Sequence, residues 1–334
     1  MLLNITSETV FLASSVAEEL SSVMEERFDV KLERPFLEIL QEQLNDPKIS
    51  LYAFFSPQGE VTGIAIANDD SYDPSHGHVQ LFYVQGTMMT EGVSEDAKQA
   101  EAKFFSEFFE QLKGIYESII CELSFLTPTL YQLMTRNGFT NHPRILMSLS
   151  VEKIPPNQAA LPRCYSLRPL LRGEERNLAE LLVDLNRGGL DTIIFPFFQS
   201  VEGTKNFVQT FMSQTNQGCH QVLEYKGIPV GVCLVEPQDP KTAFISEVGL
   251  ILQHRGKGLG RALLTHTLHS IRSIEPQVEK ICLAVTEENS PALGLYKSMG
   301  FGVERRSHAL VWKRPSGSEC RPLEASQVLN DPNS

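Results

Sequence analysis

The stretch Val248-Gly-Leu-Ile-Leu-Gln-His-Arg-Gly-Lys-Gly-Leu-Gly-Arg-Ala-Leu-Leu264 decides how this chain folds. In it, an apolar strand runs into a tight turn, and an amphipathic helix follows. The turn contains Gly256, Gly258 and Gly260. These glycines let the backbone turn sharply and approach a ligand closely, and the first N–H groups of the helix lack helical partners. With Lys257 and Arg261 beside them, they predict a site for a phosphate or pyrophosphate.

Two common nucleotide-binding motifs do not fit this turn. A P-loop requires Lys followed by Ser or Thr after its glycines, and neither pair occurs here. A dinucleotide-binding turn follows the pattern G-x-G-x-x-G and opens a βαβ unit, whereas several strands precede this turn. The structural alternative is a glycine-rich helix cap with no ligand.

The remainder of the second half predicts a mixed α/β sandwich. We expect strands at 165–169, 222–225, 228–236, 244–252 and 280–285, with a closing strand pair at 301–313. We expect helices at 174–185, 204–212, 259–273 and 290–299.

The first half resembles a weaker copy of the second. It predicts strands at 50–55, 60–68, 79–84 and 116–125, and helices at 97–112 and 128–136. Pro128–Phe139 can be laid over Ser290–Phe301, since both segments end in Gly-Phe after a short helix and lead into a strand. An internal duplication is the economical interpretation. We therefore expect a first domain at 1–150, a proline-rich linker at 151–163, a second domain at 164–314 and a flexible tail at 315–334.

Length, charge and cysteine usage narrow the class of protein. A chain of 334 residues has room for about two domains. The net charge is −12, with 22 acidic and 9 basic residues in 1–150 against 19 and 20 in the rest. This charge balance disfavours nucleic-acid binding, because phosphate contacts need clustered Lys and Arg. The acidic first half could attract a cationic partner, or its charge could only keep the protein soluble. No apolar run reaches the ~18 residues that a membrane-spanning helix needs, so we expect no membrane span. The start has no basic leader and no C-x-x-C pair occurs, so we expect a reducing, cytoplasmic location.

Two motifs, in order along the chain, resemble the GCN5-related N-acetyltransferase (GNAT) family. Arg255, Gly258 and Gly260 form the R-x-x-G-x-G pattern of the family's motif A. About 30 residues later, Asn289-Ser-Pro-Ala-Leu-Gly-Leu-Tyr-Lys-Ser-Met-Gly-Phe301 is similar to the family's N-x-x-A-x-x-L-Y-x-x-x-G-F signature. The whole chain resembles the tandem two-domain type, such as mycothiol synthase. The resemblance implies an α/β fold of two tandem GNAT-like domains, each a mixed, mostly antiparallel central sheet flanked by helices.

The resemblance also implies roles in binding acetyl-CoA. The backbone of Val248, Gly249 and Leu250 would pair with the pantetheine arm like an added strand. The pyrophosphate would be held by Arg255, Gly256, Lys257, Gly258, Leu259, Gly260 and Arg261. Asn289 would contact the cofactor from the last helix. Tyr296 would protonate the departing thiolate, because a phenol can donate a proton without being ionised at neutral pH; the alternative for it is a core aromatic.

The general base is a separate question. Acetyl transfer needs a neutral amine at the moment of attack, so a carboxylate or a water chain must accept a proton. Glu247 is the best-placed carboxylate, although strand alternation requires a bulge to turn it toward the site, and Ser246 is the other candidate for that face. Relatives that acetylate the N-termini of ribosomal proteins carry Leu-Glu-Val in the next strand. Here the triplet is Leu283-Ala-Val285, which argues against that acceptor.

The first copy lacks the corresponding residues. Met134 takes the place of Tyr296, and the loop 85–97 has three acids and no Lys or Arg, so it would repel a pyrophosphate. We therefore expect a catalytically inactive first domain that shapes the acceptor cleft or stabilises the pair. The run from Asp69 to His78 lacks metal-ligand spacing, so it predicts a solvated loop, and we expect no metal.

Three hypotheses follow for the function. The first is an acetyl-CoA-dependent N-acetyltransferase whose second domain moves the acetyl group directly to an amine of a small molecule or protein. The second is a non-catalytic CoA-binding or protein-interaction module, and the third a plain nucleotide-binding protein. The expected partners are acetyl-CoA and an amine acceptor, with no nucleic acid and no membrane. The chain would be a monomer or a homodimer, because two copies in tandem can already imitate the family's common dimer.

Overall fold

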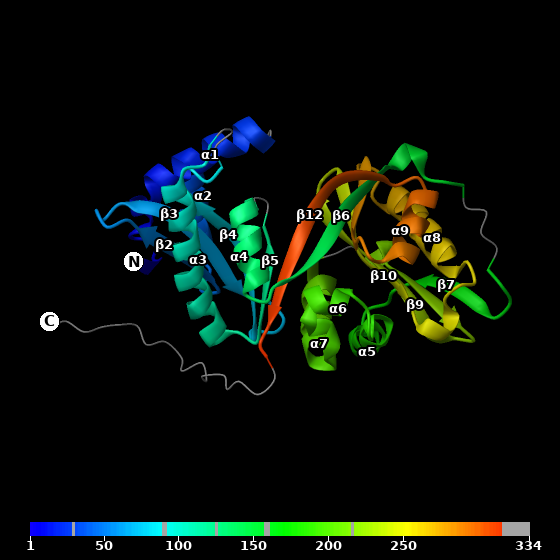
Figure 1. The fold of residues 1–334 in the computed structure, drawn as a ribbon. Helices are drawn as coiled ribbons and strands as arrows, with labels where there is room; N and C mark the ends of the chain where they lie inside the picture. Colours follow the sequence, from blue (N-terminus) through cyan, green and yellow to red (C-terminus); the bar gives the residue numbers. More distant parts are fainter. Residues whose placement is uncertain (29–30, 89–91, 124–125, 157–160, 215–216, 316–334) are drawn as a thin grey trace. The chain divides into compact units, whose positions relative to one another are not determined.

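The structure, a computed structural model, describes residues 1–28, 31–88, 92–123, 126–156, 161–214 and 217–315. The chain divides into two compact units (Figure 1). The first unit contains residues 1–70, 74–141 and those from 310 onward, and the second contains residues 71–73 and 142–309. The division therefore passes through two strands, β6 (Thr140–Ser150) and β12 (Gly302–Lys313). It differs from the expected boundary at residue 150 because β6 pairs with β11 (Lys280–Thr286) from Arg144 onward.

The first unit is built on a mixed sheet. Its strands follow the order β1, β2, β3, β4, β5, and then the last residues of β12. The pairs β1–β2, β2–β3 and β3–β4 are antiparallel, and β4 runs parallel to β5. The strands are β1 (Leu2–Ile5), β2 (Ile49–Phe55), β3 (Val61–Asp69), β4 (His76–Val84) and β5 (Ser118–Glu122). The helices are η1 (Val10–Ala13), α1 (Ser14–Phe28), α2 (Phe36–Gln43), α3 (Glu95–Ile115) and α4 (Pro128–Arg136).

Each face of this sheet has its own apolar core, because side chains alternate along a strand. One core joins the sheet to the phenylalanine-rich face of α3 and to α4, and the other joins it to α1 and α2. The expected packing role of the phenylalanines is confirmed. The core residues of α3 are Phe104, Phe105, Phe108, Phe109 and Leu112. Trp312 of β12, the single tryptophan of the chain, packs in this first core.

The second unit repeats this plan. Its strands follow the order β12, β6, β11, β10, β9, β8, β7, and β10 runs parallel to β11. The further strands are β7 (Tyr165–Pro169), β8 (Gln221–Tyr225), β9 (Ile228–Asp239) and β10 (Thr242–Leu250). The helices are η2 (Val151–Lys153), α5 (Glu175–Asn186), α6 (Asp191–Ile194), η3 (Pro196–Gln199), α7 (Val201–Gln214), η4 (Gln217–Cys219), η5 (Leu252–His254), α8 (Leu259–Ile274) and α9 (Ser290–Ser298).

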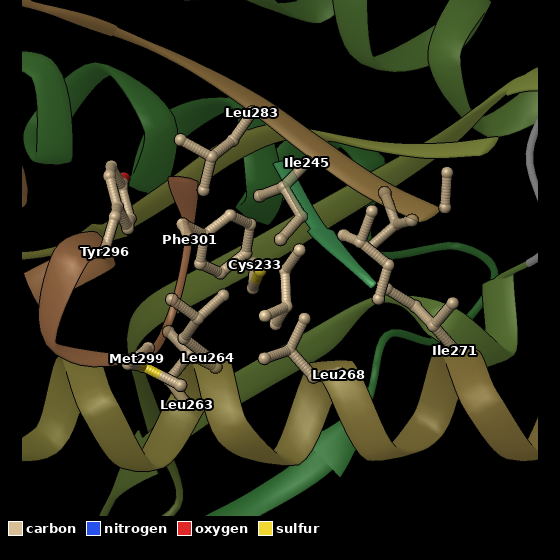
Figure 2. Close-up of a cluster of buried hydrophobic side chains, with 14 of the residues drawn as sticks. Cys233, Ile245, Leu263, Leu264, Leu268, Ile271, Leu283, Tyr296, Met299 and Phe301 are labelled. Atoms are coloured by element: carbon tan, nitrogen blue, oxygen red, sulfur yellow. The ribbon is translucent and has the colours of Figure 1, made fainter. Parts of the chain in front are cut away.

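Helices cover both faces of this second sheet. Helices α8 and α9 pack on one face, and α5, η3 and α7 pack on the other. Figure 2 shows the first of these cores, in which the leucines of α8 point toward the strands and Tyr296 lies at the edge of the cluster. The expected hairpin turn is confirmed: Lys226 and Gly227 both have positive φ, at 53° and 78°, as a two-residue turn between twisted strands requires.

Three details of the two sheets agree with an internal duplication. In each unit the parallel strands pair over four residues, 76–79 with 118–121 and 242–245 with 280–283. In each, a bulge follows directly, at Gln80 and at Ser246. In each, a side chain caps the last helix, since Thr127 accepts from the Leu130 N–H and Asn289 from the Ala292 N–H.

Several local predictions were wrong. The closing strand pair at 301–313 is one continuous strand, because no turn residue interrupts 303–313. The expected linker contains η2, and Ile154 packs in the second unit's core; its residues 157–160, like the tail at 316–334, lie outside the described residues.

The run from Asp69 to His78 is not a solvated loop. Asp70 is buried and bonds His78 at 2.7 Å, and Asp69 accepts from the Tyr116 hydroxyl at 2.7 Å. In the described part of the chain, no helix is long and apolar enough to cross a membrane.

Candidate functional site

The parallel strands β10 and β11 separate at the site. They pair only from Thr242 to Ile245, and from Glu247 onward β10 keeps its pairing with β9 alone. Strand β11 meanwhile continues along β6 as far as Thr286. Within the described residues, the edge of β10 at 248–250 that faces away from β9 therefore has no strand partner. An extended ligand can pair with such an edge as an added strand.

A bulge in β10 turns Glu247 toward the interior of the site. Ile245 pairs with Val235 and Glu247 with Leu234, so Ser246 is the extra residue. The bulge expected from the sequence is thus present. The Ser246 hydroxyl donates a hydrogen bond to the Glu236 carboxylate at 2.7 Å. Ser246 is therefore bonded to Glu236 and not to Glu247.

Glu247 is half-buried, in an environment of mixed polarity. Asn186, at the end of α5, donates to its Oε2 at 3.3 Å, and the Val248 N–H also bonds the carboxylate. Burial raises the pKa of Glu247 to about 7, and the nearby negative charge of Asp191 adds to this rise, while Asn186 and Arg255 oppose it. A carboxylate with such a pKa can accept and release a proton near neutral pH.

Tyr296, on α9, is the other titratable group of the site. The residue is only 6% exposed, and its ring packs 6.0 Å from that of Phe301. Its hydroxyl makes no hydrogen bond with any residue that the structure describes. Burial raises the pKa of Tyr296, and the charge of Glu247 raises it further, so the phenol stays protonated. Figure 2 shows its side chain pointing away from the leucines of α8.

The glycine turn presents free N–H groups at the start of α8. Gly256 and Gly258 have φ of 75° and 76°, in the left-handed region that favours glycine, and Gly258 is the N-cap of α8. The backbone N–H groups of Leu259, Gly260 and Arg261 donate to no acceptor among the described residues. Orphan donors of this kind, together with the helix dipole, form an anion site.

The cations around this turn have different partners. Arg255 donates to the carbonyl oxygens of Leu250 at 2.7 Å and Leu185 at 2.8 Å, so it braces the turn against β10 and α5. Lys257 and Arg261 are exposed, with bonds to Gln253 and Ser298 at 3.0 and 2.6 Å. Asn289 uses its side-chain oxygen as the cap of α9, at 3.3 Å from the Ala292 nitrogen.

Sequence reasoning missed a second group of polar residues beside Glu247 and Tyr296. Arg144 of β6, 8% exposed, donates to Asp191 and to Thr286, both at 3.1 Å. The Arg144 guanidinium also lies 5.4 Å from the ring centre of Phe195. Residues 144, 191 and 286 are far apart in the chain. The one signal in the sequence was a lone arginine directly before the apolar residues 145–147.

The second unit also contains a cavity away from these residues. Its volume is about 580 Å³, and it lies at the opposite end of β10, where Asp239, Thr242 and Val278 line it. None of the predicted site residues lines this cavity.

Comparisons with known proteins find a family match within the second unit. Residues 189–301 match the Acetyltransferase (GNAT) family. An 84-residue stretch is 36% identical to mycothiol acetyltransferase of Corynebacterium glutamicum, and 67 residues are 37% identical to that of Corynebacterium aurimucosum. These matches cover 25% and 20% of this chain, and the chain spans only 28% and 21% of the relatives' lengths.

Solved structures show that the fold extends over both units. A GCN5-related N-acetyltransferase from Sphaerobacter thermophilus has a TM-score of 0.65 at 17% identity, covering 94% of this chain and 96% of the other. A tandem GNAT protein from the clavulanic acid biosynthesis pathway has a TM-score of 0.54 at 15% identity, covering 95% and 99%. The predicted fold of two tandem GNAT-like domains is therefore confirmed.

Proposed function

We propose that this chain, whose residues 189–301 belong to the GNAT family, is an acetyl-CoA-dependent N-acetyltransferase. The second unit would move the acetyl group directly to an amine. The observation that carries the proposal is the open edge of β10 between the free N–H groups of α8 and the pair Glu247 and Tyr296. This arrangement can take an extended thioester with an anionic end and has a proton acceptor and a proton donor at the other end.

The residues of the second unit fit acetyl-CoA. The edge at 248–250 would pair with the pantetheine arm. The N–H groups of Leu259, Gly260 and Arg261 would hold the pyrophosphate, assisted by the exposed charges of Lys257 and Arg261. Arg255 is assigned to shaping the turn, because its donors already bond two carbonyl groups. Asn289 is assigned to starting the helix that carries Tyr296.

In the proposed mechanism, no acyl-enzyme forms. Glu247 takes a proton from the acceptor ammonium, and the neutral amine attacks the thioester carbonyl. A C–N bond forms and the C–S bond breaks as Tyr296 gives its proton to the departing thiolate. The nitrogen of the new amide gives up its second proton, which returns through water to the Tyr296 phenolate, and Glu247 loses its proton to solvent. The net change is an ammonium and acetyl-CoA giving an amide, CoA and one proton.

Features of the first unit support a non-catalytic role for it. The matching bulges put Leu81 at the position of Glu247 and the bulky Tyr83 at that of Gly249. In the turn after β4, the Gly86 N–H donates to Glu19 at 2.8 Å, and the Tyr83 hydroxyl donates to the same oxygen at 2.6 Å. A carboxylate of the chain thus uses a donor that a phosphate would need.

Calorimetric titration of acetyl-CoA into the full chain tests the proposal. We expect one site per chain and release of CoA with at least one amine from a panel of glucosamine, benzylamine, spermidine and a lysine-containing peptide. The matches to mycothiol acetyltransferases put small-molecule amines first. Absence of acetyl-CoA binding by the folded protein would refute the proposal. Two acetyl-CoA sites per chain would refute the expectation that the first unit is inactive. Binding without turnover of any amine would favour the non-catalytic CoA-binding module.

A further inference from the structure

The last residue of α5 holds one side of the Glu247 carboxylate. Asn186, 6% exposed, donates from Nδ2 to Glu247 Oε2 at 3.3 Å. The same nitrogen donates to the carbonyl oxygen of Leu182, one turn earlier in α5, at 3.1 Å. Both acceptors are oxygens, so the nitrogen end of the amide must face them, and its two hydrogens are both used. The donor that holds the carboxylate is therefore itself held by the helix.

The other side of the carboxylate lies against Gly249. Residues 247 and 249 share one face of β10, because side chains alternate along a strand. A Cβ at Gly249 would lie 3.2 Å from Glu247 Oε1 and 3.2 Å from the Leu185 Cδ1 atom. Both separations are tighter than ordinary contacts of a Cβ, so a side chain at this position would push either the carboxylate or α5. Glycine leaves the carboxylate its place between β10 and α5.

The same turn of α5 is bonded to the glycine turn. The Leu185 carbonyl oxygen accepts from Arg255 at 2.8 Å, and Arg255 also donates to the Leu250 carbonyl oxygen at 2.7 Å. Two neighbouring residues, Leu185 and Asn186, thus contact the carboxylate, the open edge of β10 and the turn before α8. Such a link fixes where a proton is accepted relative to where an anion is held. A reacting group displaced by about 1 Å can lose about 100-fold in rate.

We propose that Asn186 is a positioning residue for the reaction, and that the last turn of α5 holds the Glu247 carboxylate in place against the edge of β10. This inference rests on the proposed function, in which Glu247 accepts the proton, and adds the element that aligns it. The alternative is a purely local role, in which the Asn186 side chain bonds only its own helix. That role affects stability and leaves the titration of Glu247 unchanged.

The first test compares Asn186→Leu with Asn137→Leu. Leucine keeps the approximate size of asparagine and removes its donors. Asn137, at the end of α4, makes the matching bond within its helix, to the Leu133 carbonyl oxygen at 2.8 Å. Carbon-13 NMR of the Glu247 carboxyl, assigned with Glu247→Gln, is followed against pH. We expect the midpoint to rise by about one pH unit in Asn186→Leu, because the charged carboxylate loses a donor, and to stay unchanged in Asn137→Leu.

A second pair of variants approaches the carboxylate from its other side. Gly249→Ala places a methyl group against Glu247 Oε1, whereas a Cβ at Gly302, in β12, meets no atom of the described residues within 4 Å. We expect Gly249→Ala to displace the Glu247 signal and its midpoint, and Gly302→Ala to change neither. The charges that act on Glu247 are those of Asp191 and Arg255, and none of the four variants alters them.

Turnover gives an independent reading of the same alignment. With acetyl-CoA and the amine of the panel that is acetylated fastest, kcat of Asn186→Leu should fall about tenfold while the acetyl-CoA affinity stays unchanged. The acid limb of its kcat profile should move to higher pH, together with the NMR midpoint. Equal Glu247 titration curves in wild type and Asn186→Leu would overturn the inference, whatever the turnover. Full activity of Glu247→Gln, or no acetyl-CoA binding by the wild type, would instead refute the proposed function.

Discussion

Glu247→Gln should make the protein more stable at alkaline pH while it abolishes transfer. The folded-state pKa of Glu247 is about 7, raised from an ordinary value of 4.5. The unfolded chain therefore binds fewer protons at this group than the folded chain does between these two values. Stability falls as pH rises through this window and is constant above it. Glutamine carries no charge, so it avoids this loss.

The size of the effect follows from the shift. A rise of about 2.5 pKa units corresponds to about 3 kcal/mol at 1.36 kcal/mol per unit. We expect Glu247→Gln to match the wild type at pH 4 and to exceed it by up to about 3 kcal/mol at pH 8. The hydrogen bond that Asn186 donates is weaker to an amide than to a carboxylate, and this lowers the expected gain in stability only slightly. The oxygen of the introduced glutamine amide can still accept that hydrogen bond.

Urea unfolding at pH 4, 6 and 8 measures the difference. Hydrogen exchange of residues 242–250 follows the second unit, and far-UV circular dichroism follows both units together. Fluorescence of Trp312 follows the first unit, where that residue is buried, and serves as an internal control. If the difference in free energy of unfolding between the variant and the wild type is the same at all three pH values, the pKa of Glu247 is not raised. A variant less stable at pH 8 would show that the charged form of Glu247 is the one that the fold stabilises.

Four further substitutions separate binding, structure and chemistry in the second unit. Tyr296→Phe removes a hydroxyl with no partner among the described residues, so it should leave Tm and acetyl-CoA affinity unchanged while kcat falls about 100-fold; an unchanged kcat would exclude it as the acid. Arg255→Ala should lower stability by about 2 kcal/mol through two lost bonds, whereas Arg261→Ala should leave Tm unchanged and weaken acetyl-CoA binding about tenfold. The reverse pattern in thermal melts and calorimetry would exchange their roles. Gly258→Ala places a side chain at φ 76°, which costs about 1–2 kcal/mol; melting curves check it, and no loss would show that the turn relaxes.

Much of the fold could be predicted because its signals are local. The glycine turn, the Gly227 hairpin and the matched helices at 128–136 and 290–298 are each specified by a short stretch of sequence. The closing strand was misjudged because alternation is interrupted at 303–308 by charged and polar residues, with no turn residue between the two halves. Helix α6 was missed because four residues are too short for a periodic pattern.

The site was only partly predictable from the sequence. Glu247 and Tyr296 could be proposed because they lie in or beside recognisable motifs. The direction of the Glu247 side chain depended on a bulge, which the structure contains. Arg144 and Asp191 could not be paired, because they are 47 residues apart and meet only after β6 has joined the sheet of the second unit. Arg255 carried a motif signal for phosphate, yet its bonds to two carbonyl groups could be known only from coordinates.

The division of β12 between the units has a consequence for synthesis on the ribosome. Residues 142–309, almost all of the second unit, are translated before Leu310 and Trp312, which complete the core of the first. At about 5–20 residues per second, the first unit waits roughly 10–30 s for its last strand. During that interval the edge of β5 has no partner strand, and the ring of Phe109 lacks the Trp312 ring that packs 5.4 Å from it in the complete unit. A fragment ending at residue 150 would stay in that incomplete state.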